Sequence, residues 1–367
     1  MNSKHYIGLM SGTSMDGIDA ALVSFDPTIQ LHTTLSIDIP GALKTALTNL
    51  ISGNNISLKL LGETDVALGE LFATAVLQLL KKSGVAASDI TAIGSHGQTI
   101  YHAPNNEHPF TLQIGDPNII AARTGITTVA DFRRRDVALG GQGAPLAPAF
   151  HAYLFARCEH DQWVLNLGGI ANITYIPAEC SKDVIGFDTG PANTLLDQWC
   201  EKNTGHTYDA NGDWARSGQI ENRLLMRLLD DPYFQRPFPK STGREYFNLG
   251  WLDQKLKLFS GSVSAVDIQA TLTELTAKTV ADAITHGSTL WVCGGGYDNT
   301  YLIERIQAHC PQHIIRSTEE IGIAPKWIEA AAFAWLTKQT LDKKSGNLPS
   351  VTGAEISTIL GGVYFGG

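Results

Sequence analysis

The chain has 367 residues, of which 43% are hydrophobic and 17% are charged, and its formal net charge is −9. A chain of this length exceeds what one hydrophobic core usually serves, so we expect two domains of roughly 150–200 residues each. The net negative charge argues against nucleic acid or an anionic membrane surface as the main partner, so an anionic ligand must bind through local backbone N–H groups and a few arginines.

The first half of the chain alternates apolar strands with helices. Residues 6–23 read YIGLMSGTSMDGIDAALV, which is an apolar strand, a turn of small residues and a second apolar strand. Apolar residues at helical spacing predict helices over 41–51 and 58–82. A Gly- and Pro-rich passage over 133–148 marks the transition to a second domain. Further strands are predicted at 90–95, 111–115 and 126–130.

The second half continues the alternation. Strands are predicted around 163–176 and 184–188, and a further strand around 289–295. Asp267 is the predicted N-cap of a helix that runs to about residue 286. A strong helix is predicted over 325–341, with proline in its first turn. This alternation of strands and helices predicts an α/β protein.

These elements predict two lobes. The N-terminal lobe is expected to span residues 1–135, and the Gly- and Ser-rich segment 345–367 is expected to return and pack on it. The C-terminal lobe is expected to span residues 136–344.

The turn from Gly12 to Gly17 exposes backbone N–H groups with little side-chain bulk in front of them. Such an arrangement favours an anion, and above all a phosphate, although a plain turn explains this segment alone equally well. VLNLGGIANITYI at 164–176 repeats the order of strand, Gly-rich turn and strand. Neither turn matches a Walker A loop or a dinucleotide fingerprint. Two such turns in two halves of one chain predict a nucleotide held in a cleft between the lobes.

Asp188 ends an apolar strand and precedes TGPANT and a helix. A structural role, in which the carboxylate caps a turn, is one interpretation. The other is a catalytic base at the carboxyl end of a strand, beside a turn that binds phosphate. We favour the catalytic interpretation.

Other polar or glycine-rich positions follow predicted strands. The cluster Gly294, Gly295 and Gly296 would let a base or ribose approach the backbone, although an ordinary strand-to-helix turn explains it equally simply. Side chains that suit sugar hydroxyls or a substrate carboxylate follow two earlier strands. These residues are His96, Gln98, Thr99, Asp131 and Arg133.

Several long segments resemble the anhydro-N-acetylmuramic acid kinase family, which belongs to the actin-like ATPase superfamily of sugar kinases and heat-shock chaperones. They span most of the chain in family order. They include IGLMSGTSMDGIDAALV, GSHGQTIYH, VLNLGGIANITYI, GFDTGPANTLLDQW and WVCGGGYDN. The resemblance implies a two-lobed actin/hexokinase-like (ribonuclease H-like) α/β fold with a nucleotide cleft between the lobes.

The resemblance also implies a reaction. ATP phosphorylates O6 of 1,6-anhydro-N-acetylmuramic acid while water opens the anhydro bridge, giving N-acetylmuramic acid 6-phosphate and ADP in peptidoglycan recycling. Asp188 would activate the water and Glu329, otherwise an ordinary surface glutamate, would assist it at the sugar. His96, Gln98, Thr99, Asp131 and Arg133 would line the sugar pocket. The residues expected to bind ATP are Gly12, Thr13, Ser14, Met15, Asp16, Gly17, Ile18, Asp19, Gly168, Gly169, Asn172, Gly294, Gly295 and Gly296.

Mg²⁺ is expected to arrive with ATP, and no group of His, Cys, Asp and Glu has the spacing of a zinc site. Asp16 and Asp188 are the candidate Mg²⁺ ligands, with Asn166 as a further oxygen donor. The first strand of the superfamily commonly ends in Asp, whereas here Met10 and Ser11 precede the turn, so the metal ligands stay open.

Two alternatives remain. The first is an ATP-gated binding protein of the actin type, without sugar chemistry. The second is a serine hydrolase that uses Ser14, although Asp16 stands where the nucleophile elbow needs glycine.

The sequence also predicts the compartment. Five widely spaced cysteines without a CxxC pair indicate buried thiols in a reducing compartment. The first ten residues lack the apolar run of a signal peptide, and no segment reads as a membrane span. We therefore expect a cytoplasmic protein. The resemblance implies that its partner is a small amino sugar. Whether it forms a homodimer is left open.

Overall fold

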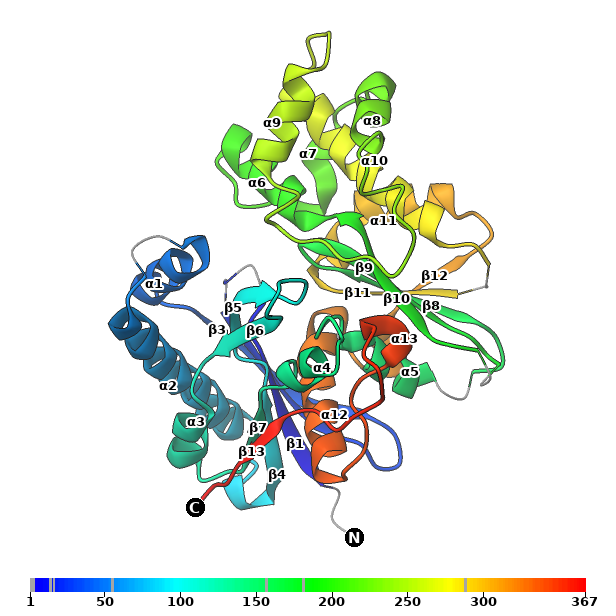
Figure 1. Ribbon diagram of the computed structural model, residues 1–367. Coiled ribbons are helices and arrows are strands. Elements are labelled where there is room, and N and C mark those ends of the chain that lie inside the picture. The colour runs from blue at the N-terminus through cyan, green and yellow to red at the C-terminus, as the bar shows by residue number, and fades with distance from the viewer. Residues whose placement is uncertain are drawn as a thin grey trace. The chain divides into compact units, whose positions relative to one another are not determined.

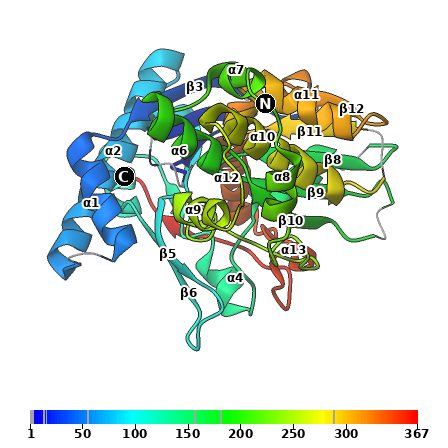
Figure 2. The ribbon, with the colours of Figure 1, turned by 90° about the horizontal axis from the view of Figure 1, so that it is seen from above.

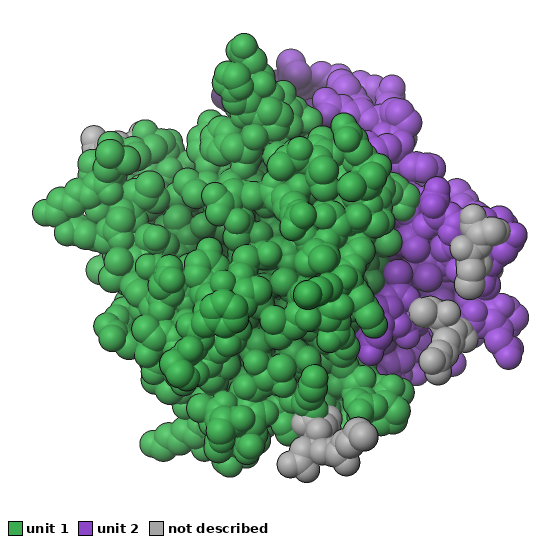
Figure 3. Space-filling model, turned by 60° about the horizontal axis from the view of Figure 1, so that its bottom comes forward, with its two compact units in different colours: residues 1–150, 327–367 green, residues 151–326 purple. Residues whose placement is uncertain are grey.

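The computed structural model describes residues 4–12, 15, 17–53, 56–155, 158–179, 182–286 and 289–367. The chain forms two compact units, residues 1–150 with 327–367 and residues 151–326, which are coloured differently in Figure 3. These boundaries differ from the expected 1–135 with 345–367, and 136–344. The reason is that the helix at Ile328–Leu341 packs on the sheet of the first unit.

The first unit is built around a six-stranded sheet, shown in Figure 1. The central strand β1 pairs with β2 in antiparallel and with β4 in parallel orientation. The strand order is β13-β7-β4-β1-β2-β3. The strands are β1 (His5–Met10), β2 (Gly17–Ser24), β3 (Gln30–Asp38), β4 (Ile90–Ser95), β7 (Thr128–Ala130) and β13 (Gly362–Tyr364). A separate hairpin joins β5 (Gln98–Ala103) to β6 (Phe110–Ile114).

Helices cover both faces of this sheet. Ile7 and Leu9 pack with Phe72 of α2 on one face. Gly8, between them, points to the other face, where a Cβ atom would stand 1.8 Å from the backbone oxygen of Ala330 in α12. The helices of this unit are α1 (Gly41–Ser52), α2 (Leu58–Ser83), α3 (Pro117–Thr124), α4 (Arg134–Ala138), α12 (Ile328–Leu341) and α13 (Pro349–Thr352). Helix α5 (Ala147–Phe155) runs across the boundary to the second unit.

The second unit repeats the same strand order. Its sheet runs β10-β9-β8-β11-β12, so an antiparallel meander of three strands is followed by two parallel strands, as in β3-β2-β1-β4-β7 of the first unit. The strands are β8 (Gln162–Leu167), β9 (Ile170–Ile176), β10 (Ile185–Pro191), β11 (Thr289–Cys293) and β12 (Ile314–Ser317). This repeated order agrees with the predicted two-lobed ribonuclease H-like α/β fold.

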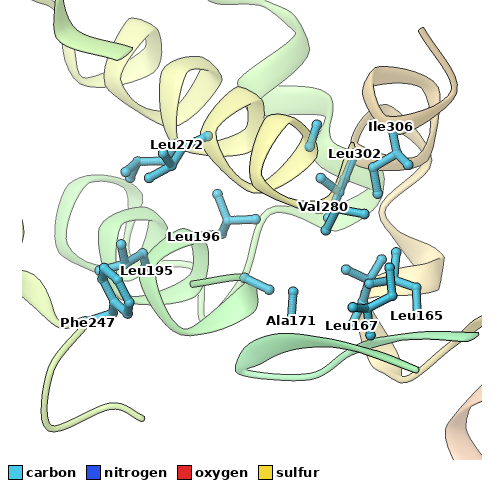
Figure 4. Packing of buried hydrophobic residues seen from close by; sticks show 14 of the residues in the cluster. Leu165, Leu167, Ala171, Leu195, Leu196, Phe247, Leu272, Val280, Leu302 and Ile306 are labelled. Atoms are coloured by element: carbon cyan, nitrogen blue, oxygen red, sulfur yellow. The ribbon is translucent and has the colours of Figure 1, made fainter. Parts of the chain in front are cut away.

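Helices bury one face of the second sheet. Figure 4 shows Leu165 and Leu167 of β8 below Val280 of α10 and Leu302 and Ile306 of α11. Helices α7 and α8 pack against α10, as Figures 1 and 2 both show. The helices are α6 (Asn193–Thr204), α7 (Asp213–Arg216), α8 (Asn222–Leu229), α9 (Leu249–Lys257), α10 (Ala265–Ala283) and α11 (Thr300–His309).

Two local predictions were wrong, namely the N-cap at Asp267 and the burial of every cysteine. Ser264, and not Asp267, is the N-cap of α10, because its hydroxyl accepts from the Asp267 N–H at 3.2 Å. The Asp267 carboxylate instead accepts from the N–H of Gln219 at 2.7 Å. Among the cysteines that the structure describes, Cys200, Cys293 and Cys310 are buried as expected, whereas Cys158 is half-buried. No helix in the described ranges is long and apolar enough to cross a membrane.

Candidate active site

A polar cluster lies where three strands of the first unit end. Ser11 follows β1, His96 follows β4 and Arg133 follows β7. These strands are parallel to one another, so their carboxyl ends share one edge of the sheet. The Ser11 hydroxyl donates to Oε1 of Gln98 at 2.7 Å, and Nδ1 of His96 donates to the Ser11 carbonyl at 3.1 Å. Nε2 of His96 is then the acceptor for Nη2 of Arg133 at 2.9 Å.

Charge and burial fix the ionisation of this cluster. Burial, followed by the charge of Arg133, lowers the pKa of His96 to about 3, so the imidazole is neutral at pH 7. Burial also lowers the pKa of Arg133 to about 10, and the charges of Glu329 and Asp136 oppose this shift. Arg133 therefore stays cationic, with the half-buried Glu329 in its electrostatic reach.

Two predicted sugar contacts have partners of their own. The Thr99 hydroxyl accepts from Nε2 of Gln113 at 3.1 Å, within the β5–β6 hairpin. Asp131, which has a positive φ of 62°, holds Arg134 with both carboxylate oxygens at 2.7 and 2.6 Å. Their role at the sugar stays a prediction. Within the described residues, neither the Thr99 hydroxyl nor the Asp131 carboxylate is hydrogen-bonded to His96 or Arg133.

The first predicted phosphate turn is described in part. Thr13, Ser14 and Asp16 lie outside the described residues. The Gly12 carbonyl accepts from the Met15 N–H at 3.2 Å, and a Cβ atom on Gly17 would stand 2.6 Å from the Ile37 oxygen. Two members of the predicted set serve the fold: the Ile18 side chain is fully buried in the core, and Asp19 accepts from the hydroxyl of Ser36.

The second turn, in the other unit, is tied to the start of α6. The Gly169 carbonyl accepts from the N–H groups of Ala192 and Thr194 at 3.1 and 3.0 Å, and the Gly168 carbonyl accepts from that of Asn193 at 3.1 Å. These hydrogen bonds hold the turn against the start of α6. Within the described ranges the N–H groups of Gly168 and Gly169 donate to no backbone carbonyl, so a ligand can accept from them.

Position 169 has no room for a side chain. A Cβ atom there would stand 2.5 Å from Oγ1 of Thr194 and 3.7 Å from Nε of Arg244. The Thr194 hydroxyl is buried and has no hydrogen-bond partner in the part of the chain that the structure describes. A cation, a buried hydroxyl and a glycine turn therefore meet at one point, which suits an anionic group.

The third glycine cluster packs on the end of β8. Gly294 has a φ of 84°, and a Cβ atom on it would stand 2.4 Å from Oδ1 of Asn166. A Cβ atom on Gly296 would stand 2.7 Å from Cβ of Leu167, whereas one on Gly295 would meet nothing within 4 Å. The backbone at Gly295 is thus open, as a flat ligand group against it would require.

Asp188 belongs to a polar row across three strands. Asn166 of β8 pairs with Asn172 of β9, which pairs with Asp188 of β10. Directly paired residues of neighbouring strands point to the same face of a sheet, so the three side chains share one face. Within the described residues no group of three His, Cys, Asp or Glu side chains could hold a metal. The row does offer carboxylate and amide oxygens, which are the ligands that Mg²⁺ prefers.

The loop between α8 and α9 holds Asp188 in place. The Asp188 N–H donates to the Lys240 carbonyl at 3.0 Å, and the Tyr233 hydroxyl donates to the Asp188 carbonyl at 2.7 Å. The Thr242 N–H donates to Oδ2 of the carboxylate at 2.9 Å. The missed signal is PKSTGRE over 239–245, in which small residues precede an adjacent Arg and Glu.

The carboxyl group of Asp188 titrates near neutral pH. Burial raises its pKa to about 7, the Thr242 N–H opposes that rise, and the charge of Glu245 adds to it. A carboxylate with a pKa near the working pH is suited to take up a proton during catalysis.

Comparison with known proteins places these features in a family. The family model described as anhydro-N-acetylmuramic acid kinase matches residues 4–366. A protein of that description from Coxiella burnetii (strain RSA 493 / Nine Mile phase I) is 57% identical over 370 residues, which cover 100% of this chain and 99% of its own. Counterparts from Shewanella loihica and Pasteurella multocida are 50% and 49% identical and cover 100% and 98% of this chain, and 100% and 96% of their own. These relatives lend no support to a binding protein without sugar chemistry or to a serine hydrolase.

Proposed function

The chain belongs to the anhydro-N-acetylmuramic acid kinase family, and from that premise we propose which of its residues carry the reaction. The enzyme is a phosphotransferase with an alcohol group as acceptor. It opens 1,6-anhydro-N-acetylmuramic acid with water and phosphorylates O6 from ATP, giving N-acetylmuramic acid 6-phosphate and ADP. This reaction belongs to peptidoglycan recycling.

Asp188 is the general base of this proposal. The observation that carries it is the placement of its half-buried carboxylate, which accepts from the Thr242 N–H at 2.9 Å and shares one face of the sheet with Asn166 and Asn172. Burial raises the pKa of this carboxyl group to about 7, which suits a base. The carboxylate takes a proton from water, whose oxygen bonds to C1 of the sugar. The C1–O6 bond breaks and O6 bonds to the γ-phosphorus, while the bond from that phosphorus to ADP breaks. Negative charge develops on O6 where the phosphoryl group arrives, so each half of the reaction assists the other.

The sugar is assigned to the cluster of the first unit. The neutral His96 and the cationic Arg133 form a fixed pair of polar groups beside Gln98. Arg133 suits the carboxylate that N-acetylmuramic acid carries, because a guanidinium binds carboxylates through two parallel hydrogen bonds. Glu329 lies within the electrostatic reach of Arg133 and would assist Asp188 at the sugar. Thr99 and Asp131 complete the proposed pocket.

ATP is assigned to the glycine turns of the two units. The N–H groups of Gly168 and Gly169, with Arg244 beside them, would bind phosphate oxygens, as would residues 12–19. Gly294, Gly295 and Gly296 would accept the ribose or base. Mg²⁺ would be held by Asp16 or by the amide oxygens of the Asn166–Asn172 row while Asp188 acts as the base, and it would stabilise charge on the phosphoryl group. We further expect a cytoplasmic enzyme and leave its assembly as a homodimer to measurement.

Incubation with ATP, Mg²⁺ and the anhydro-sugar in ¹⁸O-labelled water tests the coupled reaction. The proposal expects a 6-phosphate that carries the label on C1, because water supplies the new hydroxyl group. A phosphorylated sugar without label would contradict hydrolytic opening while leaving a simple kinase. Absence of any phosphorylated sugar would contradict the assignment of substrate.

A further inference from the structure

The loop around Asp188 begins and ends at one hydrogen-bonded cluster. We call residues 231–251 the clasp segment, because Tyr233, Lys240 and Thr242 within it form all three of the Asp188 hydrogen bonds described above. The segment runs between α8 and α9 and contains no regular helix or strand before residue 249. Backbone turns shape parts of it, such as the turn in which the Phe247 N–H donates to the Gly243 carbonyl at 3.0 Å, and side-chain contacts join these parts.

Asp231 joins the two ends of the clasp segment. Oδ1 accepts from the Tyr233 N–H at 3.0 Å and from the Tyr246 hydroxyl at 2.7 Å. Oδ2 accepts from Nε1 of Trp251 at 2.9 Å and from Nζ of Lys255 at 3.0 Å. The Asp231 side chain is only 6% exposed, so these four donors have replaced water around it. Each donor would lose its buried partner without the carboxylate.

The rings of the clasp segment pack on one another in the same region. Tyr233 and Phe247 are almost fully buried, with ring centroids 5.3 Å apart, and Trp251 lies 5.1 Å from Phe247. Nζ of Lys240 lies 4.9 Å above the Tyr233 ring and donates to the carbonyls of Tyr233 and Phe234. Tyr233 donates its N–H to Asp231 and its hydroxyl to the Asp188 carbonyl. Tyr246 donates its hydroxyl to Asp231 and its N–H to the carbonyl of Gly243, the residue after Thr242, at 3.1 Å. These two residues thus link Asp231 to the groups that bind Asp188.

The hydrogen-bond donors around Asp231 keep its carboxylate ionised. Burial raises the pKa of Asp231, but hydrogen bonds from Trp251, Tyr246, Tyr233 and Lys255 outweigh it, so the pKa lies below its usual value. A carboxylate that accepts four hydrogen bonds is held more firmly than a neutral acid, because each of these bonds is charge-assisted.

We propose that Asp231 is a positioning residue for the reaction: by closing the clasp segment, it holds the Thr242 N–H and the Tyr233 hydroxyl against Asp188. This inference rests on the proposed role of Asp188 as general base. Asp231 itself touches no reacting atom. Its effect is on where the Asp188 carboxylate points.

The variant Asp231→Asn tests this role. An amide keeps the size of the side chain, but its NH₂ group cannot accept from Trp251 and Lys255, so the clasp segment loosens. The expected result is a kcat lowered by about ten- to a hundredfold, with KM for ATP nearly unchanged. A merely structural loss would instead raise KM for ATP together with the fall in kcat.

The matched control is Asp230→Asn, the neighbouring exposed carboxylate, which should leave kcat and KM for ATP unchanged. Should Asp231→Asn fail to fold, Tyr246→Phe removes one of the four donors and should lower kcat by a smaller factor, with KM for ATP again nearly unchanged. An unchanged kcat in the variant that folds would overturn the proposal. A fall in kcat with a matching rise in KM for ATP would overturn it too, because that is what a merely structural role gives. Retention of turnover in Asp188→Asn would instead overturn the proposed base itself.

Discussion

At the scale of single residues, the proposed base Asp188 is expected to set the pH range in which this enzyme works. The base must be ionised, and burial raises its pKa to about 7, so kcat should rise with pH through that value. The pKa of Asp188 is about 4 in the unfolded chain and higher in the folded protein. The free energy of unfolding should therefore fall as the pH rises from about 4 to about 7. Asp188→Asn should abolish that loss.

Two measurements check these signs. One is the pH profile of kcat, which should show an acid limb near pH 7. The other is thermal unfolding at pH 5 and pH 8, where Asp188→Asn should gain stability relative to the parent at the higher pH. An acid limb near pH 4 would show that the carboxylate is not shifted as described.

Arg244 stands beside Gly169 and should act on the phosphates of ATP. Arg244→Met should weaken the binding of ATP by about tenfold while leaving adenosine binding unchanged, because adenosine has no phosphate. Titration calorimetry with both ligands measures this difference. Arg216→Met is the control, since Arg216 forms a surface pair with Glu304. Equal weakening of both ligands would contradict a phosphate contact.

Sequence reasoning finds some of these residues and not others. Asp188 and the glycine turns are visible because a strand with a small-residue turn leaves a local pattern. Thr242 and Arg244 are not visible, because they come to Asp188 and Gly169 through a loop with no periodicity. Glu329 reads as a surface residue until the fold brings Arg133 within electrostatic reach of it.

At the scale of elements, the close packing of α12 on the first sheet determines where Glu329 lies. Gly94 of β4 lies so near α12 that a Cβ atom would stand 2.1 Å from Oγ1 of Thr337 and 2.3 Å from the Phe333 oxygen. Glu329 sits in the first turn of the same helix, so any shift of α12 also moves that carboxylate.

Gly94→Ala should therefore destabilise the protein by about 1–3 kcal/mol or more and lower kcat, because α12 must move away from β4. Gly62→Ala is the matched control. A Cβ atom at that position of α2 meets nothing within 4 Å, so alanine should raise stability by roughly 0.5–1 kcal/mol. Urea unfolding measures both changes, and equal stability of Gly94→Ala and the parent would contradict the packing described.

Elements with strong local signals were predictable, and their ends less so. The helix predicted at 58–82 is α2, whose N-cap Ser57 accepts from the Leu60 N–H at 3.0 Å. The strand β3 was missed because Thr33 interrupts the apolar series Leu31, Leu35 and Ile37, and because it is an edge strand that is only partly buried. Ser264 and Asp267 both suit the start of a helix, and only the backbone path decides between them.

At the scale of the whole molecule, the same strand order appears in both units. The sequence shows this repeat only as two glycine turns, because pairing between strands far apart in the chain leaves no local pattern. For the same reason the sequence did not reveal that α12 belongs to the first unit. The repeat puts β1–β2 and β8–β9 in equivalent positions, which gives each unit one strand–turn–strand segment of the kind proposed to bind phosphate.

The most direct test of the account is the turnover of Asp188→Asn with ATP and the anhydro-sugar, measured beside its affinity for ATP. If Asp188 is the base, turnover should fall by about 10²–10⁴-fold, while ATP affinity stays close to that of the parent. Turnover near that of the parent protein would contradict the central claim.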